Sequence, residues 1–233
     1  MNLQGKAAVV TGAGRGIGRA IALRLAGAGM NVLAVARTAK DLKETASQAS
    51  GMPGKVLPHK ADVTRSEQVD AFVRRAVAEF GRLDVLVNNA GAAPLCKIDE
   101  ITDSLLDDTL AVNVRAVVYA CRSAWPALTR SRGAIVNISS LAALDPFPGF
   151  ALYGGTKAWV NTFSQALAGE GKPLGIRVFS LGPGAVETKM LRKVFPDLPA
   201  DQALQPDEVA AAVEWLLDER AEHTSGQTLY IRK

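Results

Sequence analysis

The residues best suited to chemistry are Ser140, Tyr153 and Lys157, with Asn113 upstream. Tyr153 and Lys157 are four positions apart, so on a helix their side chains project from one face. An ammonium group beside a phenol stabilises the phenolate and lowers the pKa of the phenol. A phenol tuned in this way can transfer a proton near neutral pH. The spacing indicates a proton-transfer site, although a solvated helix face has the same pattern.

The N-terminal segment has the pattern of a buried strand, a glycine turn and a helix. Residues 6–11 run directly into the glycine-rich stretch 12–18, and an apolar helical pattern follows with Arg19 and Arg24 on its outer face. In such a unit the glycines let the backbone approach a pyrophosphate, which binds the free N–H groups at the helix start. The pattern is T-G-x-x-x-G-x-G, because Ile17 stands where G-x-G-x-x-G requires a glycine. A tight turn without a ligand is the alternative.

Six motifs together resemble the short-chain dehydrogenase/reductase family, in the order and spacing of that family and over almost the whole chain. They are the turn from Thr11 to Gly18, the strand-4 motif Asn88-Asn89-Ala90-Gly91, the helix asparagine Asn113, the catalytic set Ser140, Tyr153 and Lys157, the pair Pro183-Gly184, and Thr188.

The resemblance implies a role for each residue of the catalytic set. Tyr153 donates a proton to the substrate oxygen during carbonyl reduction and accepts one during alcohol oxidation. Lys157 lowers the pKa of Tyr153 and bonds the nicotinamide ribose, while Ser140 holds the substrate oxygen. Ser139 is the rival, but the serine of the family commonly stands thirteen positions before the tyrosine. Asn113 holds a water that relays protons to the lysine, and a polar helix face is its alternative.

The resemblance also implies a nicotinamide cofactor. Relatives selective for NAD usually carry an aspartate at the end of the second strand, where this chain has Ala36 followed by Arg37. Together with Arg15, this substitution predicts NADP(H). The residues expected to bind the cofactor are Gly12, Gly14, Arg15, Gly16, Ile17, Gly18, Arg37, Asp62, Val63, Asn89, Ala90, Gly91, Tyr153, Lys157, Pro183, Gly184, Val186 and Thr188.

Alternating strand and helix patterns predict one α/β domain over residues 1–233, a doubly wound, Rossmann-type three-layer αβα sandwich with a parallel sheet. Strands are expected at 6–11, 31–36, 55–60, 83–87, 133–138, 174–180 and 226–231. Helices are expected at 16–28, 40–49, 66–80, 103–128, 154–169 and 207–219. Thr64 and Glu67 have capping-box spacing, and Pro206 suits a helix start. The family resemblance implies seven strands in the order 3-2-1-4-5-6-7.

Composition excludes several other function classes. The net charge of +4 is spread along the chain without interleaved aromatics, so nucleic-acid binding is a poor explanation of the basic pI. Cys96 and Cys121 are expected to be free thiols, and the two histidines show no metal-ligand spacing, so no metal is expected. The sequence shows neither a signal peptide nor an apolar run long enough to cross a membrane, which predicts a cytoplasmic protein without a membrane partner.

The chain departs from the family pattern at two places. Phe179 stands where many relatives have an asparagine that braces the sheet, so that brace is expected to be missing. The sequence ends at Ile231-Arg-Lys233 without the usual aspartate-glycine-glycine, which puts the tetramer interface in doubt. A homo-oligomer is expected, with a dimer through helices 103–128 and 154–169 favoured over a tetramer. Packing of these helices on their own sheet would use many of the same side chains.

The substrate is predicted only as a small-molecule ketone, aldehyde or secondary alcohol in a largely apolar pocket. A segment from Lys189 to Pro199, with apolar residues at near-helical spacing, is expected to cover that pocket or a subunit contact. Lys189, Arg192 and Lys193 could meet an anionic ligand or an acidic carrier protein, so a 3-oxoacyl-carrier-protein reductase is one alternative. A cofactor-binding sensor with little turnover is another.

Overall fold

The structure of the protein, a computed structural model, describes residues 3–233. Within this range seven strands form one sheet, parallel throughout, in the order β3-β2-β1-β4-β5-β6-β7. Their bounds are β1 Ala7–Thr11, β2 Asn31–Ala36, β3 Val56–Lys60, β4 Val85–Asn88, β5 Ala134–Ile138, β6 Arg177–Pro183 and β7 Thr228–Ile231. The expected strand order is confirmed.

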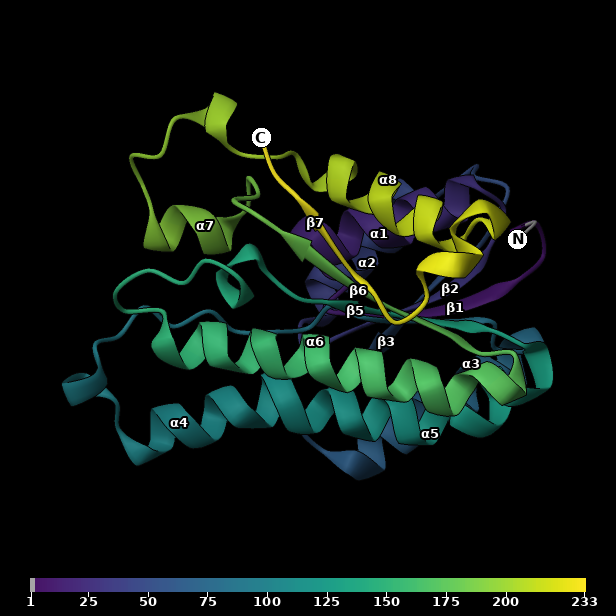
Figure 1. Ribbon diagram of the computed structural model, residues 1–233. Helices are drawn as coiled ribbons and strands as arrows, with labels where there is room; N and C mark the ends of the chain where they lie inside the picture. The colour runs from purple at the N-terminus through teal and green to yellow at the C-terminus, as the bar shows by residue number, and fades with distance from the viewer. Residues whose placement is uncertain (1–2) are drawn as a thin grey trace.

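Helices cover both faces of the sheet, which confirms the three-layer architecture (Figure 1). Apolar side chains of α1 (Gly16–Gly27), α2 (Ala39–Gln48) and α8 (Pro206–Leu217) pack on one face. Those of α3 (Ser66–Phe80), α5 (Ala116–Ser131) and α6 (Ala151–Gly171) pack on the other. The remaining helices are α4 (Asp103–Leu110) and α7 (Lys189–Val194). Strands buried on both faces explain the continuous apolar runs in the sequence.

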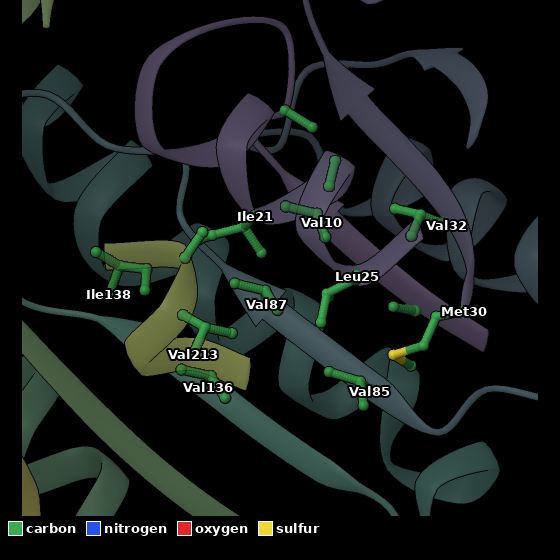
Figure 2. Packing of buried hydrophobic residues seen from close by; sticks show 14 of the residues in the cluster. Val10, Ile21, Leu25, Met30, Val32, Val85, Val87, Val136, Ile138 and Val213 are labelled. Carbon is green, nitrogen blue, oxygen red and sulfur yellow. The ribbon is translucent and has the colours of Figure 1, made fainter. Parts of the chain in front are cut away.

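The first apolar layer joins the sheet to α1 and α8. Figure 2 shows Val10, Val87 and Val136, from three different strands, facing Ile21 of α1 and Val213 of α8. Each of these side chains is fully buried. Burial of a valine or isoleucine stabilises the fold by about 1.5–3 kcal/mol, so this layer fixes α1, and the turn before it, against the sheet.

Three sequence expectations need correction. The helix expected at 103–128 is interrupted by a π-helical turn over Ala111–Arg115, which contains Asn113. The sixth strand begins at Arg177 and not at 174, because Lys172–Leu174 forms a 3-10 turn that ends at the left-handed residue Gly175, with φ of +74°. The expected capping box is also wrong, since the Thr64 hydroxyl donates to the Asp62 carboxylate at 2.8 Å. Pro206 is the first residue of α8, as expected.

A polar chain ties β6 to its neighbours, where the sequence led us to expect a missing brace. Phe179 is fully buried in the apolar layer beneath α8. On the next residue, the hydroxyl of Ser180 donates to Asn161 Oδ1 of α6 at 2.7 Å. Asn161 Nδ2 donates in turn to the Tyr230 hydroxyl of β7 at 2.8 Å. Asn161 of α6, one helical turn beyond Lys157, therefore links β6 to β7.

The loops that follow the carboxyl ends of the strands gather at one edge of the sheet. Figure 1 shows the first turn of α6 at this edge with α7 lying opposite it. Segments 88–101, 139–152 and 181–205 all contribute to this edge. Open α/β sheets bind ligands in this position.

Candidate active site

The glycine turn between β1 and α1 is shaped for close approach of another group to its backbone. Gly12 and Gly16 have φ of +67° and +54°, in the left-handed region that favours glycine. A Cβ on Gly18 would lie 2.3 Å from the Gly12 carbonyl oxygen, so no side chain fits there. The first N–H groups of α1 have no partner within the helix. This cradle fits a pyrophosphate group.

The strand-4 motif fixes the glycine turn in place. Asn89 Nδ2 donates to the Thr11 carbonyl oxygen at 2.9 Å, and the Thr11 hydroxyl accepts from the backbone N–H groups of Asn89 and Ala90 at 3.0 and 3.1 Å. The sequence placed these residues in the cofactor site. Their contacts in the structure are with the turn itself, so they shape the cradle from behind.

Arg19 was expected to be an outward-facing cation, and this expectation is wrong. Its guanidinium donates to the Gly14 carbonyl oxygen at 2.6 and 3.1 Å, and to the Glu44 carboxylate at 2.6 Å. Thr45, which is fully buried, donates from its hydroxyl to the Ala13 carbonyl oxygen at 3.0 Å. Sequence spacing could have suggested Arg19, since it lies one residue beyond the last turn glycine. The contact between Thr45 of α2 and the glycine turn joins two separate elements, so it forms only when the chain folds.

A hollow of about 290 Å³ lies where β2 and β3 end, lined by Arg37, Lys60, Ala61, Asp62 and Gln68. Lys60 is paired in register with Ala36, and both Arg37 and Lys60 are exposed. Asp62 accepts hydrogen bonds from the backbone and hydroxyl of Thr64, and these bonds, against the opposing effect of burial, hold its pKa below the usual range. The hollow therefore combines two cations with a carboxylate already engaged by its own loop.

Lys157 is buried, with 6% of its surface exposed, and its Nζ donates to the Ile138 carbonyl oxygen at 2.8 Å. Burial lowers the pKa of this lysine to about 8. Its Nζ lies 5.8 Å from the centroid of the Tyr153 ring. Tyr153 and Lys157 both lie on α6, so the expected shared helix face is present.

The expected lowering of the Tyr153 pKa does not hold in this structure. Burial raises the pKa of Tyr153, and its hydrogen bond with Ser140 only partly offsets that effect. The Lys157 ammonium is hydrogen-bonded to the carbonyl oxygen at the end of β5 and not to the phenol, so it does not offset the effect of burial on Tyr153 here. In this state Tyr153 is a protonated phenol at neutral pH.

The two candidate serines have different surroundings. The Ser139 hydroxyl is buried and donates to the Lys157 carbonyl oxygen at 3.1 Å. Ser140 Oγ accepts from the Ala142 N–H at 3.1 Å and is hydrogen-bonded to Tyr153. Ser140 is therefore the serine beside the phenol, while Ser139 joins β5 to α6.

Asn113 fastens the strand-4 loop to α6. Its Oδ1 accepts from the Ala92 N–H at 2.9 Å, and its Nδ2 donates to the Ala92 carbonyl oxygen at 2.8 Å and to the Thr156 hydroxyl at 3.0 Å. A Cβ on Gly91 would lie 3.2 Å from Asn113 Oδ1 and 3.6 Å from Lys157 Nζ. The π-helical turn, a feature common at functional sites, thus places the Asn113 amide next to the buried lysine.

The last expected cofactor residues close the cradle from the opposite side. Pro183 ends β6 and Gly184 donates its N–H to Ile231 at 2.8 Å. Val186 and Val63 are both buried. Thr188 caps α7, and its methyl carbon lies 3.2 Å from where a Cβ on Gly16 would be. The two ends of the predicted cofactor site therefore meet across the edge of the sheet.

A cluster of three phenylalanines adjoins Tyr153. The Phe150 ring lies 5.2 Å from the Tyr153 ring, centroid to centroid, and 4.3 Å from that of Phe147. Phe195, which follows α7, lies 5.5 Å from Phe147 and 6.2 Å from Phe150. These side chains come from two distant segments, so only folding brings them together.

Arg192 of α7 was expected to be available to an anionic ligand. It is instead held by both carboxylate oxygens of Glu187, and its Nη1 donates to the Pro196 and Leu198 carbonyl oxygens at 3.1 and 2.6 Å. Lys189 and Lys193 remain exposed. The guanidinium therefore stabilises the shape of the 189–199 segment.

Comparison with known proteins identifies the family. The family model for short chain dehydrogenase matches residues 6–199, which is most of the chain. The protein is a short-chain dehydrogenase/reductase. The chain is 34% identical to 3beta-hydroxysteroid dehydrogenase 1 of Eggerthella lenta, over 99% of this chain and 93% of that protein.

Two solved structures of short-chain dehydrogenase/reductases show the same likeness. A short chain dehydrogenase from Burkholderia cenocepacia in complex with NADP superposes with a TM-score of 0.92 and 34% identity, covering 100% of this chain and 98% of that one. A 3-ketoacyl-(acyl-carrier-protein) reductase from Brucella melitensis complexed with NADH gives a TM-score of 0.91 and 33% identity, covering 99% and 98%. This short-chain dehydrogenase/reductase is thus an oxidoreductase acting on hydroxyl or carbonyl groups, in a family that uses nicotinamide cofactors.

The described residues, 3–233, hold neither a metal-binding cluster nor a membrane-length helix, and their cysteines are not paired in a disulfide. In that range no group of three or more histidine, cysteine or acidic side chains is arranged to hold a metal ion. Helices with the length and apolar character of a membrane span are likewise absent from it. Cys96 and Cys121, both within it, are free thiols.

Proposed function

We propose that this enzyme reduces a ketone or aldehyde to the alcohol with NADPH, and catalyses the reverse reaction with NADP⁺. The observation that carries the proposal is that Ser140, Tyr153 and Lys157 lie together, with Lys157 Nζ near Gly91 of the strand-4 loop that holds the glycine turn. When bound, the nicotinamide supplies the hydride to the carbonyl carbon or takes it back from the alcohol. The remaining chemistry concerns the substrate oxygen, where negative charge develops.

Tyr153 transfers its phenolic proton to that oxygen, so a C–H and an O–H bond form on the substrate while the phenol becomes a phenolate. Because burial raises its pKa, Tyr153 is protonated at neutral pH, as a proton donor must be. Ser140 donates a hydrogen bond to the same oxygen and orients it. In alcohol oxidation the proton returns to the Tyr153 phenolate.

Lys157 lies between the phenol and the cofactor site. Its Nζ carries three protons, of which one is bonded to Ile138 and the others are available to the ribose hydroxyls and to a water held near Asn113. The closeness of Gly91, Asn113 and Lys157 supports this assignment. With its charge next to a phenolate, Lys157 stabilises Tyr153 after proton transfer.

The preference for NADP(H) rests on charge at the end of β2 and β3. Ala36 leaves no carboxylate to repel a 2′-phosphate, and Arg37 and Lys60 line one hollow beside it. Arg15 is exposed at the start of α1. The relative from Burkholderia cenocepacia was solved with NADP, which supports the proposal, whereas the Brucella melitensis relative was solved with NADH.

A 3-oxoacyl group on an acyl carrier protein is a second candidate substrate. The likeness to the Brucella melitensis reductase favours it. The engagement of Arg192 by Glu187 reduces the basic surface available to such a carrier to Lys189 and Lys193.

We further propose one cytoplasmic domain over residues 1–233 that forms a homo-oligomer through the outer faces of α5 and α6. Trp159 and Phe163 stack on α6 with centroids 4.7 Å apart and are only partly buried, as is Trp125 of α5. Sedimentation velocity on the protein, with and without NADPH, measures the oligomeric state, and a monomer at micromolar concentration contradicts this proposal.

The function is tested by following NADPH absorbance with a panel of ketones, aldehydes and 3-oxoacyl thioesters, and by following NADP⁺ reduction with the matching alcohols. Turnover of at least one carbonyl, faster with NADPH than with NADH, is the expected result. Tight cofactor binding measured by fluorescence, without turnover of any carbonyl or alcohol, would instead indicate a cofactor sensor.

A further inference from the structure

The proton donor is bordered by a cluster of three phenylalanines, Phe147, Phe150 and Phe195. Phe150 is buried and meets the Tyr153 ring edge-on, with the planes 64° apart. Phe147 lies between Phe150 and Phe195, with 41% of its surface exposed. The cluster therefore runs outward from the phenol, from the buried ring of Phe150 to the exposed ring of Phe147, with the partly buried Phe195 packed against both.

A second apolar wall continues from this cluster. Leu95 fits against Gly149, whose missing Cβ would lie 2.7 Å from Leu95 Cδ1 and whose carbonyl oxygen accepts from the Cys96 N–H at 2.9 Å. Leu95 is 49% exposed and Leu144, in the same loop pair, is 64% exposed. Large side chains of this kind, gathered from separate loops next to a reactive group, usually mark a binding surface.

The 189–199 segment is held in one shape near the phenylalanine cluster. Arg192 fastens α7 to the carbonyl oxygens of Pro196 and Leu198, the residues that follow Phe195 on either side of Asp197. Phe195 is thereby presented to Phe147 and Phe150. Since Arg192 is also paired with the Glu187 carboxylate, the 189–199 segment offers an aromatic ring at this point in place of a free guanidinium.

We propose that the substrate is an uncharged ketone or secondary alcohol with a bulky apolar body, a long chain or fused rings, which packs against Phe147, Phe195 and Leu95 while its oxygen reaches Tyr153. This inference rests on the proposed carbonyl reduction and deepens it. Small polar carbonyls do not cover the exposed apolar surface of the phenylalanine cluster and are therefore poor substrates. Carbonyl compounds with a carboxylate at the far end of the chain are poor substrates because the charge would have to lose its water against apolar side chains.

The test is a series of methyl ketones from butanone to 2-octanone, followed by a fused-ring ketone, with 7-oxooctanoate as the charged partner of 2-octanone. All are assayed with saturating NADPH. The expected kcat/KM rises by about fourfold per added methylene until the apolar surface of the cluster is covered. This is the gain that burial of one methylene gives. The carboxylate analogue is expected to lose at least about tenfold relative to 2-octanone.

Substitutions in the phenylalanine cluster test whether the dependence of kcat/KM on chain length arises there. Phe195→Ala and, separately, Phe147→Ala are expected to lower kcat/KM for 2-octanone about tenfold and for butanone less than about twofold. Phe195→Leu, which keeps an apolar side chain, is expected to recover most of the loss. Phe80→Ala is the matched control, because this partly buried phenylalanine ends α3 and packs on the core away from Tyr153.

The outcomes separate the two proposals. Turnover of butanone without a gain along the series, or equal losses for butanone and 2-octanone in Phe195→Ala, overturns the apolar substrate while carbonyl reduction stands. Absence of turnover with every ketone, at cofactor occupancy confirmed by fluorescence, overturns carbonyl reduction and the apolar substrate with it.

Discussion

The ammonium nitrogen of Lys157 lies 5.8 Å from the centre of the Tyr153 ring and donates a hydrogen bond to the carbonyl oxygen of Ile138, the last residue of β5. The pair shares a helix face without a direct bond between the charged group and the phenol oxygen. Burial therefore moves both pKa values in the direction that favours the neutral form, upward for Tyr153 and down to about 8 for Lys157. Proton transfer and the pH dependence of stability both depend on this arrangement.

Tyr153→Phe is expected to reduce kcat by at least about a thousandfold, because it removes the proton donor while keeping the ring that Phe150 contacts. The dissociation constant for NADPH is expected to stay within about twofold, since the phosphate cradle is unchanged. Stopped-flow turnover and fluorescence titration measure the two quantities. Tyr119→Phe on α5 is the matched control and should leave both unchanged. A Tyr153→Phe enzyme with kcat within a few-fold of the parent would exclude the assigned role.

The pH dependence should differ between the two directions of the reaction. Reduction requires the phenol of Tyr153, and its raised pKa keeps that form dominant through neutral pH, so the reduction rate falls only in alkaline solution. Oxidation requires the phenolate, so its rate rises with pH over the same alkaline range. Initial rates from about pH 6 to about pH 10.5 with both substrates check this. An oxidation rate that levels off below neutral pH would show that cofactor binding lowers the Tyr153 pKa strongly.

Lys157 should make folding stability depend on pH. Its pKa is about 8 in the folded protein against 10.5 for a lysine exposed to water, so between these values the unfolded chain binds more protons and the free energy of unfolding rises with pH. The gain across the window is roughly 3 kcal/mol and is absent below about pH 8, where both states are protonated. Urea denaturation at about pH 7 and about pH 10.5, compared between the parent and Lys157→Met, isolates this effect. Equal pH dependence in the two proteins would contradict it.

Cofactor choice should respond to three substitutions at the ends of β2 and β3. Ala36→Asp combined with Arg37→Gln is expected to shift the ratio of kcat/KM for NADPH over NADH toward NADH by about ten- to a hundredfold for each charged contact changed. Lys60→Gln alone should lower the NADPH value about tenfold and leave the NADH value unchanged, because only NADPH carries the 2′-phosphate.

The control for Lys60→Gln is Lys55→Gln, an exposed lysine just before the opposite end of β3. It should change neither value. A parent enzyme that already has the higher kcat/KM with NADH would remove the basis for the assignment, whatever the effect of the substitutions.

The 189–199 segment should become more accessible when its internal contacts are removed. Arg192→Met deletes the bonds to Glu187, Pro196 and Leu198, so limited proteolysis in this segment is expected to accelerate about tenfold. In the parent, NADPH with substrate should slow the same cleavage. Arg220→Met, which removes an exposed ion pair with Asp218, is the control and should leave the rate unchanged. Cleavage that is indifferent to ligand in the parent would mean that the segment does not cover the site.

The sequence by itself determined the order of strands and helices and the family. Apolar runs of strand length can be buried only in a sheet covered on both sides, and the glycines near Thr11 and the pair Tyr153 and Lys157 recur at fixed local spacing. Local spacing also predicted that Tyr153 and Lys157 share a face, since four residues on a helix settle that without reference to the rest of the chain.

Tertiary structure decided what each side chain contacts, because those partners lie outside the helix that carries the side chain. Lys157 is hydrogen-bonded to Ile138, Arg19 to the glycine turn and Arg192 to Glu187. Each contact determines whether the positive charge of that side chain can still meet a ligand. The aromatic cluster beside Tyr153 likewise requires Phe195 to reach Phe150 across the edge of the sheet. Spacing fixes neighbours within one helix or turn, whereas burial and hydrogen bonding between elements depend on the packing of the whole domain, and it is this packing that sets the pKa values and the apolar surface of the site.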